Sequence, residues 1–194
     1  LPEVIARFAA RHPRIDIAVH EGSYAELAGP LRDGDIDMTV GALREGALAP
    51  DLAQIAVFED HPALIMRAGH PLLARQDHLA TAIFDYPWLM PSRETPLRRY
   101  WEGMVHALGR EVPHVGIECG SVMMIRQLLL AGEGLTLLSP DQVAVELTAG
   151  VLAALPPPVP VSRTIGITTR AGWRPTAAQA EFIALLHETG RKIG

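Results

Sequence analysis

The chain has a single cysteine, Cys119, among its 194 residues, so it cannot form an internal disulfide framework. This composition favours a reducing compartment, and we expect a cytoplasmic protein. No apolar run approaches the roughly 20 residues of a membrane-spanning helix, because Gly132, Glu133 and Gly134 interrupt the longest one. Residues 1–14 contain neither the basic region nor the apolar stretch of a signal peptide. The sequence therefore supports neither membrane insertion nor export.

Clustered positive charge is also missing. The chain has 17 lysine and arginine residues against 22 acidic ones, a net charge of −5, and its cations are scattered. Binding to a phosphate backbone requires a stripe or patch of cations. We therefore predict that these residues alone do not bind nucleic acid.

Motifs for metal, nucleotide or hydrolytic chemistry are absent as well. The eight histidines are dispersed without the spacing of a metal site. Residues 131–135, AGEGL, end a predicted helix where a phosphate-binding loop would begin one, so their glycines indicate a helix C-cap. No G-x-S-x-G elbow surrounds Ser92, Ser121 or Ser139. We predict no metal, no cofactor and no catalysis.

What the sequence does contain is an alternation of helical and strand periods, which is typical of an α/β fold. The hydrophobic share of 48% is enough for one large domain or two small lobes. The predicted helices cover residues 2–11, 23–34, 79–84, 95–109, 121–131, 140–148 and 176–190, and the predicted strands 15–22, 36–41, 52–60, 62–68, 87–90, 115–119, 135–139 and 162–170. Two βαβ blocks flank a strand-rich segment in which the chain would cross from one lobe to the other. The stiff proline run 156–160 suits another such crossing between lobes. The pattern predicts two lobes with a cleft.

Two of these helices carry unusual features. Pro30 lies inside the helix 23–34, where it removes a hydrogen bond and predicts a kink or a split. The helix 121–131, which contains VMMIRQLLLA, is apolar nearly all round, and this predicts a helix buried between a sheet and other elements.

Several segments, taken in order, resemble the effector-binding domain of LysR-type transcriptional regulators. Residues 1–43 join an L-P helix, a P-x-hydrophobic strand, a G-[ST] turn and an L-x-x-G-x-[IL]-D strand. The similarity continues through AGHPL at 68–72, DYPWLMPSRETPLR at 85–98, VGIECGSVMMIRQLLLAGEGLTLLS at 115–139 and AGVLAAL at 149–155. Each motif is weak alone, but the ordered set covers essentially the whole chain.

The resemblance implies two Rossmann-like lobes joined by two crossover strands, in the manner of type II periplasmic binding proteins. Residues 1–67 with 162–194 would form lobe I, which lacks the family's usual N-terminal strand, and residues 68–161 would form lobe II. It also implies a small-molecule effector in the interlobe cleft and a homodimer or tetramer of the full-length protein. DNA would be bound only through an N-terminal winged helix-turn-helix, which is absent from this sequence.

Candidate effector-binding residues follow the predicted strands, where ligands collect in α/β sheets. Glycines, hydroxyls and helix N-termini at these points favour carboxylate or phosphate groups, although any one serine or threonine is simply a helix cap. The predicted effector-binding residues are Ser23, Gly41, Ala42, Ser92, Glu94, Thr95 and Ser121. Arg93 favours a carboxylate and Glu94 a hydroxyl-rich or cationic ligand, so a carboxylate and a sugar-like effector both stay open, as does a role for Arg44.

The resulting hypothesis is a ligand-sensing domain of a bacterial LysR-type regulator. The first alternative is a free solute-binding protein for uptake, which a signal peptide upstream would favour. The second is an enzyme of deaminase or dehydratase type on the same fold, which would require turnover of the bound metabolite that depends on Ser92 or Thr95.

Overall fold

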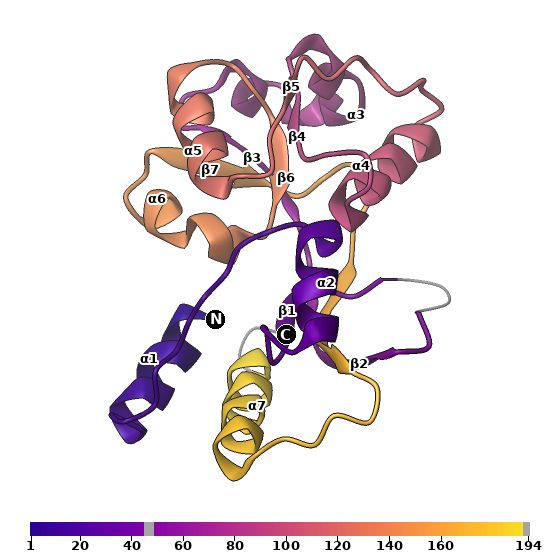
Figure 1. The fold of residues 1–194 in the computed structure, drawn as a ribbon. Helices are drawn as coiled ribbons and strands as arrows, with labels where there is room; N and C mark the ends of the chain where they lie inside the picture. The colour runs from indigo at the N-terminus through magenta and orange to yellow at the C-terminus, as the bar shows by residue number, and fades with distance from the viewer. Residues whose placement is uncertain (45–48, 192–194) are drawn as a thin grey trace. The chain divides into compact units, whose positions relative to one another are not determined.

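The computed structural model describes residues 1–44 and 49–191, and its chain divides into two compact units (Figure 1). The first comprises Leu1–Asp60 and Arg163–Gly194, and the second His61–Ser162. The chain therefore passes between the units twice.

The first unit is built on an antiparallel sheet of order β1-β8-β2. Its strands are β1 (Thr39–Ala42), β2 (Leu52–Asp60) and β8 (Arg163–Arg170), and its helices are α1 (Pro2–Arg11), α2 (Tyr24–Asp33) and α7 (Ala177–Gly190). Helices α1 and α7 pack against each other through Phe8 and Phe182, whose ring centroids are 5.3 Å apart. The ion pair between Arg7 and Glu188, at 2.9 Å, joins the same two helices. This core anchors the ends of the described chain to the sheet.

Helix α2 begins and ends where its sequence predicts. Ser23 is the N-cap: its Oγ accepts a hydrogen bond from Glu26 N–H, and Glu26 accepts one from Ser23 N–H in return. Gly34 ends the helix in the left-handed region, at φ 90°. Of the predicted kink or split at Pro30, the split is wrong, because the helix continues to Asp33. Pro30 lies in the last turn, where its missing N–H removes only one internal hydrogen bond.

The strand predicted at residues 15–22 is wrong. This segment runs between α1 and α2 without regular secondary structure (Figure 1), and Ile15, Ile17 and Val19 are exposed. A strand needs a hydrogen-bonded neighbour for its backbone, and no described strand pairs with this segment. The alternation of apolar residues is present, but the partner strand is not.

The second unit contains an antiparallel sheet of order β6-β3-β7 and a parallel pair, β4 and β5. A parallel bridge between Trp88 and Leu135 connects β4 to β6. The strands are β3 (Ala63–Arg67), β4 (Leu89–Met90), β5 (Ile117–Glu118), β6 (Thr136–Leu138) and β7 (Leu152–Leu155). The helices are α3 (Leu79–Ala82), α4 (Pro96–Ala107), α5 (Val122–Ala131) and α6 (Ala144–Thr148). The 3-10 turns are η1 (Pro71–Ala74), η2 (Gln76–His78), η3 (Ile83–Asp85) and η4 (Pro140–Val143).

Side chains from β3 divide between two cores of the second unit. Leu64 and Met66 pack with Trp101 and other residues of α4, whereas Ile65 packs with Leu129 and other residues of α5. Successive residues of a strand point to opposite faces of the sheet. Helices α4 and α5 therefore cover opposite faces. Every helix within residues 1–44 and 49–191 is too short or too polar to span a lipid bilayer.

Helix α5 is less buried than its composition predicts. Ile125 and Leu129 are buried, but Met123 and Met124 are 70% and 54% exposed and Leu130 is 41% exposed. The expectation of burial on all sides is wrong, because the sheet covers only one face of this helix and no other described element covers the opposite one.

His70 is a buried neutral side chain at the turn after β3. Its Nδ1 accepts a hydrogen bond from Leu72 N–H at 3.0 Å, and its Nε2 lies 3.2 Å from the Glu133 carbonyl oxygen. Since Nδ1 is an acceptor, Nε2 carries the proton and donates it to Glu133. Burial lowers the pKa of His70 below its ordinary value of 6.5, and this outweighs the opposing hydrogen bond to Glu133.

We expect His70 to make the stability of the protein depend on pH. The unfolded chain takes up a proton on this residue near pH 6.5 and the folded chain only at lower pH, so the free energy of unfolding is expected to fall as the pH drops below about 6.5. Urea unfolding of the wild type and of His70→Gln at pH 8, 7, 6 and 5.5 measures this effect. The difference between the two proteins isolates His70 from the other histidines, and an equal pH dependence in both would contradict the expectation.

Candidate functional site

Strands β4 and β5 end together at one edge of the second unit. They are parallel neighbours, with Leu89 opposite Ile117 and Met90 opposite Glu118. Cys119 N–H donates to the Met90 carbonyl oxygen at 2.9 Å, which extends this pairing by one residue. The segments after the two strands therefore start side by side, as ligand-binding edges of parallel strands do.

The segment after β4 forms a capped helix start. Thr95 is the N-cap of α4: its Oγ1 accepts a hydrogen bond from Arg98 N–H at 3.3 Å, and Pro96 is the first helical residue. The Thr95 hydroxyl donates to the Ser92 carbonyl oxygen at 2.8 Å. Ser92 Oγ accepts only a long hydrogen bond from Glu94 N–H, at 3.4 Å. Ser92 thus stabilises the turn that leads to the cap.

The segment after β5 forms a second capped helix start. Ser121 is the N-cap of α5, and its exposed Oγ accepts a hydrogen bond from Met124 N–H at 3.3 Å. The N–H groups of Val122 and Met123 form no hydrogen bond with another described residue. Such unpaired N–H groups and the aligned peptide dipoles attract anions to a helix N-terminus. This edge therefore brings together two helix starts that favour a negatively charged group.

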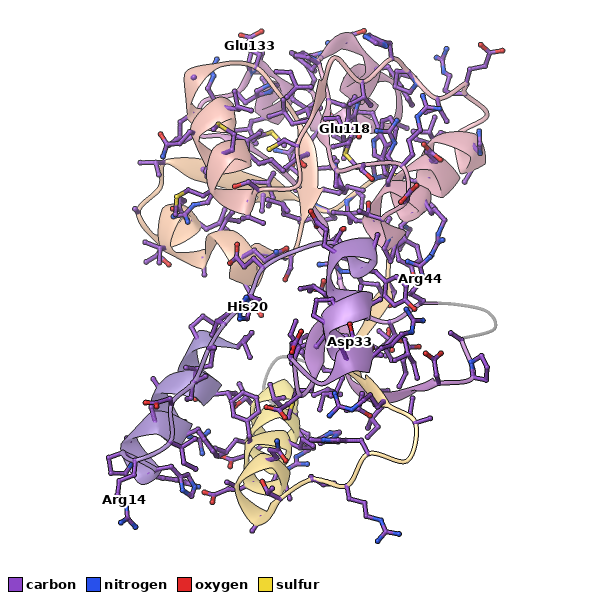
Figure 2. The ribbon with its side chains drawn as sticks, in the orientation of Figure 1. Arg14, His20, Asp33, Arg44, Glu118 and Glu133 are labelled. Carbon is purple, nitrogen blue, oxygen red and sulfur yellow. The ribbon has the colours of Figure 1, made fainter. Side chains whose placement is uncertain are left out.

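The charged residues around this edge are solvent-exposed. Arg93 and Glu94 lie in the turn before α4, and neither forms an ion pair with a described residue. Glu118, the last residue of β5, is also exposed (Figure 2). The two acidic side chains oppose an anion, whereas Arg93 favours one.

Ser139, which is not among the predicted effector-binding residues, also belongs to this edge. It follows β6, which is joined to β4 in parallel, so it lies at the same carboxyl edge. Ser139 is 7% exposed and caps η4 together with Gln142. The run LTLLS followed by Pro140 is the sequence signal for this position, since it predicts a strand that ends at a serine before a helix start.

In the first unit, one side-chain contact joins the segment after β1 to the start of α2. Arg44, labelled in Figure 2, follows β1. Its Cζ lies 4.5 Å from the ring centroid of Tyr24, the first residue of α2. Gly41 is exposed and Ala42 is half-buried at the end of β1, and Ser23 is the N-cap of α2. The hydrogen bonds from Ser23 lower the pKa of the Glu26 carboxyl below its ordinary value of 4.5, so a carboxylate already occupies part of this helix start.

The predicted residues thus fall into two groups. The second unit brings Ser92, Glu94, Thr95 and Ser121 to one edge. Ser23 stands at the start of α2 in the first unit, and Gly41 and Ala42 stand at the end of β1. Strand β1 pairs with β8 in an antiparallel manner, so among the described strands only those of the second unit end side by side in parallel. No group of three or more histidine, cysteine, aspartate or glutamate residues suited to a metal ion occurs within residues 1–44 and 49–191.

Comparison with known proteins gives one family. Residues 1–191 match the family model described as the LysR substrate binding domain. The HTH-type transcriptional regulator GalR of Pseudomonas putida is 32% identical over 190 residues, which is 97% of this chain and 47% of GalR. This chain therefore spans about half the length of that relative. Because the relative GalR is named as a transcriptional regulator, the comparison favours the regulator hypothesis over a free solute-binding protein.

Solved structures of the same fold include two regulatory domains. The cofactor-binding domain of the Cbl transcriptional regulator has a TM-score of 0.82 at 20% identity, with 100% of this chain and 86% of that chain covered. The CcmR regulatory domain of Synechocystis PCC6803, in complex with 2-PG, has a TM-score of 0.81 at 20% identity, with 99% and 91% covered. These similarities confirm the predicted α/β fold of the periplasmic-binding-protein-like type II class.

Proposed function

The chain belongs to the LysR substrate binding domain family, and on this basis we propose that it is the effector-sensing domain of a transcriptional regulator. It binds a small metabolite, of carboxylate or sugar-like chemistry, and performs no catalysis. Binding shifts the arrangement of the two units, and a helix-turn-helix domain of the whole protein transmits the shift to DNA. The whole protein acts in the cytoplasm as a homodimer or tetramer.

The observation that carries this proposal is the pair of helix starts at the end of β4 and β5. Both helices begin with a hydroxyl cap, and α5 has N–H groups that no described residue uses. We assign Ser92, Glu94, Thr95 and Ser121 to the effector, together with Ser23, Gly41 and Ala42 from the first unit. The CcmR domain, which shares the fold, was solved with 2-PG, and this supports a small-molecule ligand for the present chain.

A thermal-shift screen against carboxylates and sugars tests this function, with the hits repeated on Thr95→Ala and Ser121→Ala. Each variant is expected to bind the hit about 3- to 10-fold more weakly, because it loses a hydroxyl hydrogen bond and loosens the helix start. Isothermal titration calorimetry gives the affinities.

The matched control is Thr176→Ala, because Thr176 caps α7 with the same hydroxyl-to-backbone hydrogen bond. All three variants are expected to lose about 1 kcal/mol of folding stability. Only Thr95→Ala and Ser121→Ala should lose affinity. A ligand that binds all four proteins equally well would place the site elsewhere.

A further inference from the structure

Two buried donors on α4 have no hydrogen-bond partner among the described residues. They are Nη1 of Arg98 and Nε1 of Trp101, and these residues are 1% and 0% exposed. The two side chains are in contact, since Arg98 Cζ lies 4.9 Å from the ring centroid of Trp101. Buried donors in folded proteins are nearly always paired. Two unpaired donors on contacting side chains suit an acceptor from outside the described chain.

Arg98 is only partly neutralised by its own helix. Its Nε donates to Glu102 Oε1 at 2.9 Å, and the Glu102 side chain is 30% exposed, so that carboxylate faces the solvent in part. The guanidinium group is planar and carries five N–H donors in fixed directions. Glu102 accepts from Nε, which leaves Nη1 without an acceptor. A buried charged donor is costlier to leave unpaired than a neutral one.

Trp101 differs from the tryptophan beside it. Trp88 is equally buried, its ring centroid is 5.2 Å from that of Trp101, and its Nε1 donates to the Ile83 carbonyl oxygen at 3.2 Å. Burial in this core is thus compatible with a paired indole. Trp101, which contacts Arg98, has no such partner in the described part of the chain.

Both residues belong to the helix that starts at the candidate site. Arg98 is in the first turn of α4, because its backbone N–H donates to the N-cap hydroxyl of Thr95. A first turn ordinarily favours acidic side chains, since the helix dipole is positive there. The first turn of α4 contains no acidic residue. Arg98 therefore adds positive charge where an anion would be stabilised.

We propose that Arg98 Nη1 and Trp101 Nε1 hold the carboxylate group of the effector. This inference rests on the proposed function and narrows the ligand class to carboxylic acids. A carboxylate offers two oxygen atoms to two donors, and its hydrogen bond to a guanidinium is charge-assisted. Because neither donor atom is open to solvent, the ligand reaches them only after the packing over them opens. We expect an association rate constant below about 10⁵ M⁻¹s⁻¹.

Indole NMR signals test the inference directly. The ¹⁵N-labelled chain contains three tryptophans, and Trp101→Phe assigns the signal of Trp101. Titration with benzoate or shikimate is expected to move this signal downfield until saturation, while the Trp88 signal stays in place. Benzamide, which matches benzoate in shape but lacks the charge, is expected to leave the Trp101 signal unchanged.

Calorimetry on variants supplies a second readout. Arg98→Met is expected to weaken carboxylate binding at least tenfold, and Trp101→Phe about fivefold. Arg99→Met, at an exposed neighbouring position, and Trp88→Phe, which removes a paired indole N–H, are the controls and should bind normally. If Arg98→Met does not fold, the affinity of Trp101→Phe and the shift of the Trp101 indole signal test the inference without it.

The outcomes separate this inference from the proposed function. A carboxylate that binds the wild type and depends on Thr95, but leaves the Trp101 signal and the affinity of Trp101→Phe unchanged, overturns the inference alone. Binding of neutral sugars without any carboxylate also overturns it. If neither class binds the wild type, the proposed function itself fails.

Discussion

Replacing Gly166 by alanine is expected to lower the free energy of unfolding of the first unit by about 3 kcal/mol or more. Gly166 lies in the central strand β8, opposite Gly41 on one side and Ala56 on the other. A Cβ atom at this position would lie 2.3 Å from the Ile55 carbonyl oxygen and 2.7 Å from a methyl group of Leu43. The methyl group of Leu43 can rotate away, but the backbone oxygen can move only with its strand.

The cross-strand neighbour of Gly166 supplies the control for stability. Gly41→Ala places its Cβ where no atom lies within 4 Å, so it is expected to change the free energy of unfolding by less than about 1 kcal/mol. Urea unfolding of the wild type and of both variants makes the comparison. Equal stabilities of Gly166→Ala and Gly41→Ala would show that β8 and β2 are not packed as described.

Replacing Arg163 by methionine is expected to cost about 3–5 kcal/mol of folding stability. Arg163 Nε donates to Asp60 Oδ2 at 2.6 Å, and the two side chains are 11% and 6% exposed. Asp60 and Arg163 are directly opposite each other on β2 and β8, at the ends where these strands meet the boundary of the unit. The variant leaves the Asp60 carboxylate buried without its cation, and this penalty dominates the expected loss.

Two further variants separate this effect from the loss of any ion pair. Asp60→Leu combined with Arg163→Met removes both charges and is expected to recover most of the stability. Arg32→Met breaks the exposed pair with Asp51 and should cost less than about 1 kcal/mol. Urea unfolding measures all three. A loss below 1 kcal/mol for Arg163→Met alone would contradict the buried character of the Asp60 pair.

Local chemistry explains why much of the fold was predictable. The dipeptide Thr95-Pro96 combines a hydroxyl cap with a residue suited to the first helical position, and α4 begins there. Gly34 tolerates positive φ, and α2 ends there. In both cases the deciding interactions span four residues or fewer. Such local interactions can be predicted from the sequence alone, because all the residues involved are close together in it.

The errors have a different physical origin. Residues 15–22 have the alternation of a strand, but pairing depends on a neighbouring strand that a local pattern does not contain. Helix α5 has apolar residues on all sides, but the exposure of Met123 and Met124 depends on what packs over them. Tertiary surroundings decide both features.

The candidate site was predictable in part for the same reason. The principle that polar residues after parallel strands meet at one edge correctly groups Ser92, Thr95 and Ser121, because β4 and β5 are neighbours. Their role in effector binding stays a prediction. The burial of Arg98 was not predictable, since an arginine four residues before a glutamate ordinarily indicates a solvated helix face.

The most direct test of the account is a map of backbone amide shifts, by ¹H–¹⁵N NMR, for the chain saturated with the best ligand from the screen. The largest changes are expected on residues 92–95 and 120–123, at the starts of α4 and α5. If the ligand saturates the protein while those amides keep their positions and the changes gather elsewhere, the site at the end of β4 and β5 is contradicted.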